Sequence, residues 1–190
     1  MSFDVSACPD GQLARLSRAG DERAFAELVR RHKDPIYRLA RSCTGDADEA
    51  LDIVQDAFVA AHGALRRYDP ERSFRAWLAR IALNKCRDWS RRRAVRRLFS
   101  LPGLTADLAA EYADPTPGVE QEAADRQELA RLEQGIAALP RALREVLVLR
   151  TIEGLSQAET ADALGVTEKA VETRLYRARA KLADVRDSGR

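Results

Sequence analysis

The polar side chains with the most informative types and spacing lie near the C-terminal end of the chain. Donors and acceptors recur there at helical intervals, which places them on one face of a helix; they are Lys169, Glu172, Thr173, Tyr176 and Arg177. Apolar residues recur on the opposite side; they are Val171, Leu175, Ala178 and Leu182. Because such polar groups can hydrogen-bond to base edges in the major groove, the first set is a candidate base-reading face.

The residues around this helix have the order of a helix-turn-helix motif. Ser156 and Glu159 have the spacing of a capping box at the start of one helix, and Gly165 is suited to end it. Thr167 is placed to cap the helix that follows. Cations beside the reading face suit phosphate contacts; they are Arg174, Arg179 and Lys181. A solvated basic surface is the alternative, but the two-helix order favours DNA binding.

A second cationic stripe belongs to a helix that begins near Ser73. Its buried side is expected to hold Phe74, Trp77, Leu78 and Ile81. Its flank carries polar residues at helical spacing; they are Arg80, Asn84, Arg87 and Arg91. Arginine can neutralise phosphates and an asparagine amide can bond to a base edge, so this flank is suited both to bind and to read nucleic acid.

Two aromatic features near this stripe have alternative interpretations. Trp77 is expected in the core, whereas Trp89, beside the arginine run, is suited to stack an exposed ring on an unpaired base. The loop from Tyr68 to Ser73 combines an aromatic ring with hydrogen-bonding groups and is suited to hold a flipped base. An ordinary turn at Asp69-Pro70 is the alternative for this loop.

Scaffold helices and an acidic helix are expected before that stripe. Asp21 is suited to open one helix, and a separate segment ends at Gly45. The acidic helix spans about residues 47–65. Its apolar side is predicted to hold Leu51, Val54, Phe58 and Leu65, and its other side Asp52, Ile53, Asp56 and Ala60. Acids beside an exposed isoleucine suggest protein docking, and an ordinary solvated surface is the alternative.

Composition excludes several classes of protein. The 190 residues suffice for two small domains, and 45% hydrophobic content supports packed cores. No apolar run approaches the ~20 residues that cross a bilayer, and no signal peptide is recognisable, so a cytoplasmic location without membrane insertion is expected. Cys8, Cys43 and Cys86 are odd in number and widely spaced, which predicts reduced thiols rather than a disulfide framework.

No catalytic, metal or cofactor site is predicted. A carboxylate cluster occurs in the acidic helix, but it lacks the glycine and ligand order of a calcium loop; it comprises Asp46, Asp48, Glu49, Asp52 and Asp56. His32 and His62 have no partner at metal or triad spacing, and each is expected at an interface or the surface.

Charge is partitioned along the chain although the net charge is only +2. Residues 87–99 hold six arginines and one acid, whereas residues 107–133 hold eight acids and two arginines. Helical periodicity without strand patterns predicts an all-α fold of two small helical domains, and prolines and glycines among the acids predict a flexible linker between them. The expected parts are an N-terminal segment at 1–20, a first domain at 21–98, the linker at 99–122 and a second domain at 123–187.

Over about residues 21–186, the chain resembles the extracytoplasmic-function sigma factors of bacterial RNA polymerase. The resemblance is carried by DIVQDAF at residues 52–58, FRAWLARIALN at 74–84, and the segment from Leu139-Pro140 to Arg179. It implies that the first domain is the region-2 helical bundle, which binds the polymerase clamp and opens the promoter. It likewise implies that the second domain is the region-4 helix-turn-helix.

The resemblance also implies roles for particular residues. The polymerase-binding set is Asp52, Gln55, Asp56 and Phe58. The minus-ten set is Tyr68, Ser73, Arg80, Asn84, Arg87, Asp88 and Arg91. The minus-thirty-five set is Lys169, Glu172, Thr173, Arg174, Tyr176 and Arg177. Many family members carry a basic or small residue where this chain has Glu172, which is suited to accept from a cytosine amine, so promoter preference cannot be transferred.

The implied partners are core RNA polymerase, through its clamp and flap, promoter DNA, and an anti-sigma factor. The chain itself is expected to recruit without catalysis. Two other classes remain open at this stage. One is a stand-alone helix-turn-helix regulator whose first domain dimerises; the other is a metal-dependent nuclease or recombinase that uses the carboxylates of residues 46–56, although no nucleophile motif accompanies them.

Overall fold

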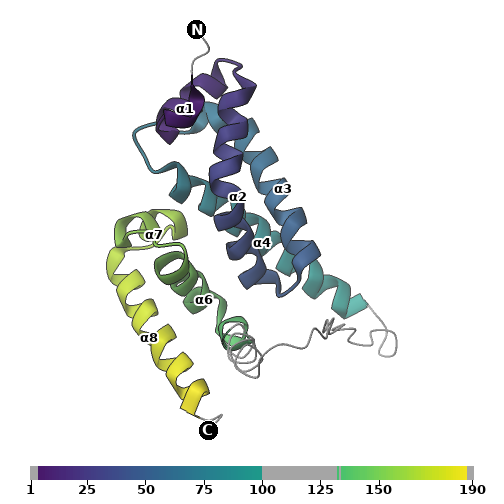
Figure 1. Cartoon of the computed structure of the whole chain (residues 1–190). Coiled ribbons are helices and arrows are strands. Elements are labelled where there is room, and N and C mark those ends of the chain that lie inside the picture. Colours follow the sequence, from purple (N-terminus) through teal and green to yellow (C-terminus); the bar gives the residue numbers. More distant parts are fainter. Residues whose placement is uncertain (1–3, 100–131, 133, 188–190) are drawn as a thin grey trace, which may run out of the picture.

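The chain is all-α over the residues that the structure describes. The computed structural model describes residues 4–99, 132 and 134–187, and no strand occurs among them. The longer helices are α1 (Asp10–Arg18), α2 (Glu22–Thr44), α3 (Ala47–Ala64), α4 (Phe74–Phe99), α6 (Arg141–Leu147), α7 (Gln157–Leu164) and α8 (Glu168–Asp187). Figure 1 shows α1 to α4 in one bundle with α6 to α8 beside it. The predicted linker lies outside the described residues apart from Phe99, where α4 ends.

The expectation of two helical segments between Asp21 and Gly45 is wrong, because α2 is one continuous helix. The Asp21 carboxylate accepts hydrogen bonds from two backbone N–H groups of the first turn at 3.0 and 3.4 Å, and Gly45 ends the helix with a φ of 72°. Pro35 lies inside the helix and removes one backbone donor. Leu28 and Ile36, on either side of it, are both buried, so packing of one continuous stripe outweighs this local loss.

The helix α3 has the predicted span, but its buried stripe differs from the prediction. Leu51, expected in the core, is 57% exposed, whereas Ile53, expected at the surface, is only 4% exposed. The buried residues of α3 are Ala50, Ile53, Ala57, Phe58 and Ala61. The prediction used the bulkiest apolar residues, while α3 contacts both α2 and α4 and buries small alanines between them. The true stripe is therefore rotated around the helix.

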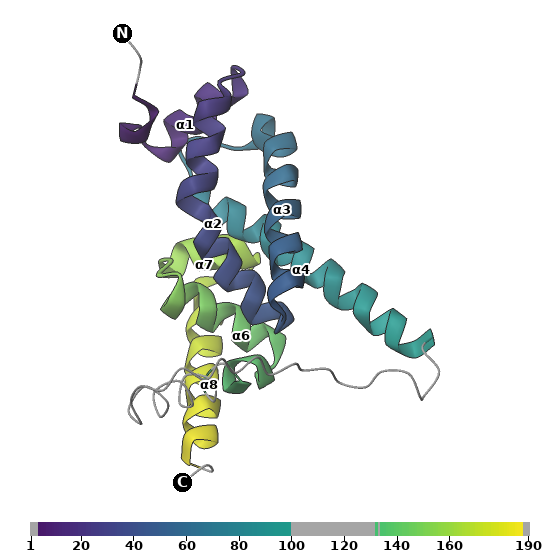
Figure 2. The ribbon, with the colours of Figure 1, turned by 45° about the vertical axis from the view of Figure 1, so that its right-hand side comes forward.

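The helix α4 is largely buried over its first turns and mostly exposed over its last turns. Phe74 and Leu78 are buried as expected, and Trp77 is partly buried. The interpretation of Trp89 as an exposed ring is wrong, because this residue is buried and its indole N–H donates to Glu49 at 2.6 Å. The last turns of α4 extend away from the other helices (Figure 2), and these turns carry the arginine run.

The helix α1 was not predicted, and it packs on α2 within the segment assigned to residues 1–20. Leu13 and Ala14 are fully buried in the same core as α2. Asp10 accepts from side chains of α2 at 2.9 and 2.7 Å. A Cβ on Gly11 would lie 2.4 Å from the carbonyl oxygen of Pro70, so only glycine permits this close approach to the loop before α4.

The helix-turn-helix prediction is confirmed by its capping contacts. The Ser156 hydroxyl accepts from the backbone N–H of Glu159 at 3.1 Å, and the Glu159 carboxylate accepts from the Ser156 N–H at 2.8 Å. Gly165 ends α7 with a φ of 68°. The Thr167 hydroxyl accepts from the N–H of Ala170 at 3.2 Å at the start of α8. Local residue types are thus sufficient to specify both helix ends.

The two groups of helices share one apolar core. After α6, the chain forms a wide π turn, η3 (Val148–Ile152), and Leu155 follows it. Val148, Leu149 and Leu155 are fully or almost fully buried in the cluster that contains the core residues of α1, α2 and α4. Contacts also join α4 to α7 and α2 to α6 (Figures 1 and 2). The second group therefore lies directly against the first.

Candidate nucleic-acid interface

The predicted base-reading residues of α8 are all exposed. We call this set the α8 face; it comprises Lys169, Glu172, Thr173, Tyr176 and Arg177. Lys169 and Glu172 form a surface ion pair at 2.9 Å, and an exposed pair of this kind is weak enough to be exchanged for DNA contacts. Val171 and Ala178 are buried on the opposite side, as the periodicity predicted.

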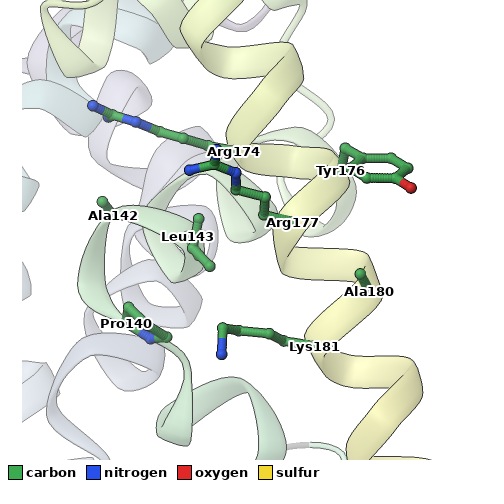
Figure 3. A pocket seen from close by; sticks show the side chains of 8 residues that line it. All are labelled: Pro140, Ala142, Leu143, Arg174, Tyr176, Arg177, Ala180 and Lys181. Atoms are coloured by element: carbon green, nitrogen blue, oxygen red, sulfur yellow. The ribbon is translucent and has the colours of Figure 1, made fainter.

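The long side chains in the middle of α8 point in two directions. Figure 3 shows Arg174, Arg177 and Lys181 extending over α6, while Tyr176 points to the other side of α8. The groove between the helices is lined by Pro140, Ala142, Leu143, Arg174, Tyr176, Arg177, Ala180 and Lys181. Tyr176 is 76% exposed, so its ring is free to contact a partner. Arg177 and Tyr176 therefore point to different sides of α8.

The cationic flank of α4, which we call the α4 stripe, comprises Arg80, Asn84, Arg87 and Arg91. Arg80 and Asn84 are exposed, and Arg91 pairs with Asp88 at the surface. Arg87 is partly buried; it donates to both carboxylate oxygens of Glu145 at 2.9 and 3.2 Å. This hydrogen bonding raises the pKa of Arg87, so its positive charge is secure.

The loop before α4 is built around its own side chains. Tyr68 is 3% exposed, its ring packs on Phe74 and Trp77, and its hydroxyl donates to the Arg72 carbonyl at 2.5 Å. Burial raises the pKa of Tyr68 to about 12. The hydroxyl of Ser73 accepts from a backbone N–H of the first turn of α4 at 3.3 Å. A base contact from Tyr68 or Ser73 stays a prediction, and in this structure both side chains serve the loop.

The acidic side of α3, which we call the α3 face, comprises Asp52, Gln55 and Asp56, and all three are exposed. Phe58 is 6% exposed and supports this surface from beneath. An apolar groove adjoins it between α2 and α3; it is lined by Phe25, Val29, Lys33, Leu51, Val54, Gln55, Phe58, Val59 and His62. Leu51 and Val59, at 57% and 68% exposure, supply the exposed apolar surface that had been assigned to Ile53.

Two buried glutamates from the second group bind arginines of the first. Glu153, 3% exposed, accepts from Arg38 at 3.0 and 3.1 Å and from Arg75 at 3.2 Å. Glu145, 4% exposed, accepts from Arg87. A buried carboxylate is tolerated when it is paired and hydrogen-bonded, so these contacts specify how the two groups pack.

Glu145 and Glu153 were missed by sequence reasoning. A signal was present, because Glu145 directly precedes the apolar run at residues 146–149, where an acid interrupts a buried pattern. The identity of the paired arginines could not be foreseen, since they lie 58 to 115 positions away in the sequence.

A helical bundle with a cationic stripe, packed beside a helix-turn-helix with an exposed polar helix, defines a two-part DNA-binding protein. The family model described as Sigma-70 region 2 matches residues 28–96, and Sigma-70, region 4 matches residues 129–182. Both models match the parts of the chain that carry these helices. Among the described residues, no helix is long and apolar enough to span a bilayer.

Curated relatives and solved structures agree with this assignment. RNA polymerase sigma factor CnrH of Cupriavidus metallidurans is 47% identical over 181 residues, covering 94% of this chain and 95% of the relative. ECF RNA polymerase sigma factor SigW of Bacillus subtilis is 34% identical, covering 87% and 90%. The structure of CnrH in complex with the cytosolic domain of CnrY matches with a TM-score of 0.72 at 40% identity, covering 97% and 99%.

The sigma factor RpoE of Bartonella quintana, in complex with the anti-sigma factor NepR, matches with a TM-score of 0.70 at 21% identity, covering 87% of this chain and 98% of RpoE, which supports the fold. The chain belongs to the extracytoplasmic-function group of the sigma-70 family of RNA polymerase sigma factors. The predicted family and the all-α fold class are thereby confirmed.

Proposed function

We propose that this sigma factor brings core RNA polymerase to promoters through two DNA-reading helices, α4 and α8. The observation that carries the proposal is that each group of helices has its own exposed polar helix surface, the α4 stripe and the α8 face. The chain performs no catalysis in this scheme. It acts in the cytoplasm, where the polymerase and its DNA are found.

The α4 stripe contacts the minus-ten element. Asn84 offers an amide that can bond to the edge of an unpaired base, and Arg80 is placed one turn away to neutralise a phosphate. Capture of unpaired bases stabilises the open bubble, so binding energy drives promoter opening. Arg87 joins this surface after it leaves Glu145.

The α8 face contacts the minus-thirty-five element in the major groove. Thr173 and Arg177, which are exposed, are suited to base edges, whereas Arg174, which is half-buried over α6, is suited to a phosphate. Glu172 is suited to accept from a cytosine amine once its ion pair with Lys169 opens. Sequence preference at this element therefore depends on residues particular to this chain.

Polymerase binding is assigned to the α3 face and the apolar groove beside it, which meet the clamp. Exposed acids around Leu51 and Val59 combine specificity with apolar area, as protein interfaces require. The second group of helices meets the flap. Two modest DNA contacts joined on one polymerase gain effective concentration, so binding is selective when the spacing of the two promoter elements fits.

An anti-sigma factor is the proposed regulator. The relatives CnrH and RpoE are each described in complex with a protein partner, the cytosolic domain of CnrY and the anti-sigma factor NepR respectively. Because this chain shares most of its length with CnrH, a partner that covers its polymerase-binding surface is the expected means of control.

In vitro transcription from fragmented genomic DNA tests this function. Purified core polymerase is assayed with and without the chain, and every new RNA start is mapped by sequencing. Discrete starts that share a two-part upstream motif are expected. Tight specific DNA binding without polymerase, with no new starts, would instead establish a stand-alone regulator.

A paired variant sharpens the assay. Asn84→Ala should abolish most open-complex formation at these starts while binding to core polymerase is retained. Arg18→Ala is the matched control, because Arg18 is an exposed residue on α1, away from both reading surfaces. Equal loss in both variants would show that the effect is not specific to the α4 stripe.

A further inference from the structure

Two cysteines that are far apart in the sequence meet in the fold. Cys43 lies near the end of α2 and Cys86 lies in the middle of α4, and both belong to the apolar cluster that contains Ile53 and Trp89. Cys86 is 4% exposed, while Cys43 is partly exposed. All three cysteines of the chain are free thiols in this structure.

The surroundings of the pair favour reaction at Cys43. A hydrogen bond with the Cys86 thiol, opposed by burial, lowers the pKa of Cys43, and the positive charge of Arg144 on α6 lowers it further. The same hydrogen bond and burial raise the pKa of Cys86. The Arg144 Nε is buried and has no hydrogen-bond partner among the residues that the structure describes. Of the two thiols, Cys43 is therefore the one that is favoured as a thiolate.

We propose that Cys43 and Cys86 are a peroxide-reactive dithiol, which hydroperoxides convert to a disulfide that joins α2 to α4 beside α6. The proposal does not depend on the assigned promoter contacts. It concerns a reaction of two side chains, and it can be tested without polymerase or DNA.

The reaction balances in two steps. The Cys43 thiolate attacks one oxygen of the hydroperoxide, the O–O bond breaks, and the leaving alkoxide or hydroxide takes a proton to give an alcohol or water. Cys43 is then a sulfenic acid. The Cys86 thiol loses its proton, its sulfur attacks the Cys43 sulfur, and the departing hydroxide combines with that proton as water. The two thiols supply the two electrons that the peroxide accepts, and cellular thiols reverse the bond.

The location of the pair links this chemistry to the packing of the two groups of helices. Arg87 directly follows Cys86 and holds Glu145, and both Arg144 and Glu145 influence the thiols electrostatically. A sulfur–sulfur bond would hold the two sulfur atoms about 2 Å apart, which is shorter than any non-bonded approach. The bond would therefore constrain α4 beside Arg87, which binds Glu145 of α6, and Trp89 in the same cluster would report the change.

Cys8 provides an internal control. It is also buried, but its thiol donates to the Asp4 carbonyl at 3.7 Å, and it belongs to a different cluster from Cys86. If burial alone decided reactivity, Cys8 and Cys86 would react with peroxide in the same way. The proposal predicts instead that only Cys86 forms a disulfide with Cys43.

The experiment treats the full reduced chain with hydrogen peroxide and identifies linked peptides by mass spectrometry. A Cys43–Cys86 linkage should form roughly tenfold or more faster in the folded chain than in the same chain unfolded in urea, because the fold holds the two thiols together. The Cys8→Ser variant should behave like the parent. Linkage that forms no faster in the folded chain, or that mainly involves Cys8, would overturn the proposal.

Two variants establish the order of the steps. In Cys86→Ser, a sulfenic acid on Cys43 should accumulate and be captured by a dione probe, whereas Cys43→Ser should leave Cys86 unmodified. Circular dichroism checks that each variant is folded. Labelling of Cys86 in preference to Cys43 would contradict the assigned nucleophile, and the comparison of folded and unfolded parent chain needs no variant.

Discussion

The two helices proposed to read DNA, α4 and α8, are held in opposite ways. The α8 face is exposed throughout, and its one ion pair lies at the surface. The α4 stripe has its central cation, Arg87, bound to a buried carboxylate of the neighbouring group of helices. If both helices contact DNA as proposed, α8 can do so as it stands, whereas Arg87 of α4 must first exchange its contact with Glu145 for one with nucleic acid.

Glu145 is well suited to this exchange. A carboxylate and a phosphate offer a guanidinium the same pair of acceptor oxygens, so Glu145 occupies on Arg87 the place that a DNA phosphate would take. Glu153 holds Arg38 and Arg75 in a similar way. The packing of the two groups thus competes with the function proposed for α4.

The largest effect is expected from the double variant Glu145→Gln, Glu153→Gln. Loss of both charges should separate the two groups of helices. Breaking a fully buried ion pair costs roughly 3–5 kcal/mol, and the cost per pair is lower here because the arginines are partly exposed. Small-angle scattering should show a larger radius of gyration. Glu168→Gln, an exposed acid on α8, is the control. An unchanged radius would show that the apolar core alone holds the groups together.

A smaller effect is expected at α8. Arg177→Ala should weaken binding of the holoenzyme to its promoter by roughly 1–3 kcal/mol and relax preference at one base position. Arg179→Ala should weaken binding to all sequences alike and reduce the salt dependence by about one ion, as for a phosphate contact. Binding titrations at several salt concentrations measure both. The same response from both variants would remove the distinction between base reading and phosphate contact on α8.

At α4, the Arg87→Lys variant tests whether the guanidinium of Arg87 is itself needed to contact DNA. Lysine keeps the charge but cannot form two parallel hydrogen bonds to a carboxylate or to a phosphate, so the geometry of both contacts is lost while the charge attraction remains. We expect open-complex formation to change by less than about threefold, within the range of a single exposed charge contact. Loss as severe as that expected for Asn84→Ala would show that the guanidinium itself reads DNA.

The smallest effect concerns the first group of helices alone. Hydrogen bonds from Arg30 and Arg31 lower the pKa of Glu27 from 4.5 to about 2. A lowered pKa in the folded state gives stability that is present above 4.5 and is lost as the pH falls towards about 2. The free energy of unfolding, measured with urea, should therefore fall less at acid pH in Glu27→Gln than in the parent chain. The control variant Glu22→Gln should behave like the parent. An unaltered pH dependence would contradict this assignment.

Local signals predicted the helix-turn-helix well, and long-range packing explains most of the errors. Ser156, Glu159 and Gly165 act within one or two turns, so their roles are visible in the sequence. Leu51 and Ile53 exchanged their predicted environments because α3 is covered on two sides, which periodicity on one helix cannot reveal. The arginine neighbours of Trp89 suggested an exposed ring, while the partner that holds it in the core, Glu49, lies 40 positions away.

The sequence by itself determined the all-α class, the capped helices and the family, because capping, periodicity and motif spacing are local properties. The tertiary structure alone decided that Arg87 is held by Glu145, that Tyr68 lies in the core, and that Cys43 meets Cys86. Each of these depends on which helices pack together. A pairing across many positions follows from burial of shared apolar surface, and no local pattern records it.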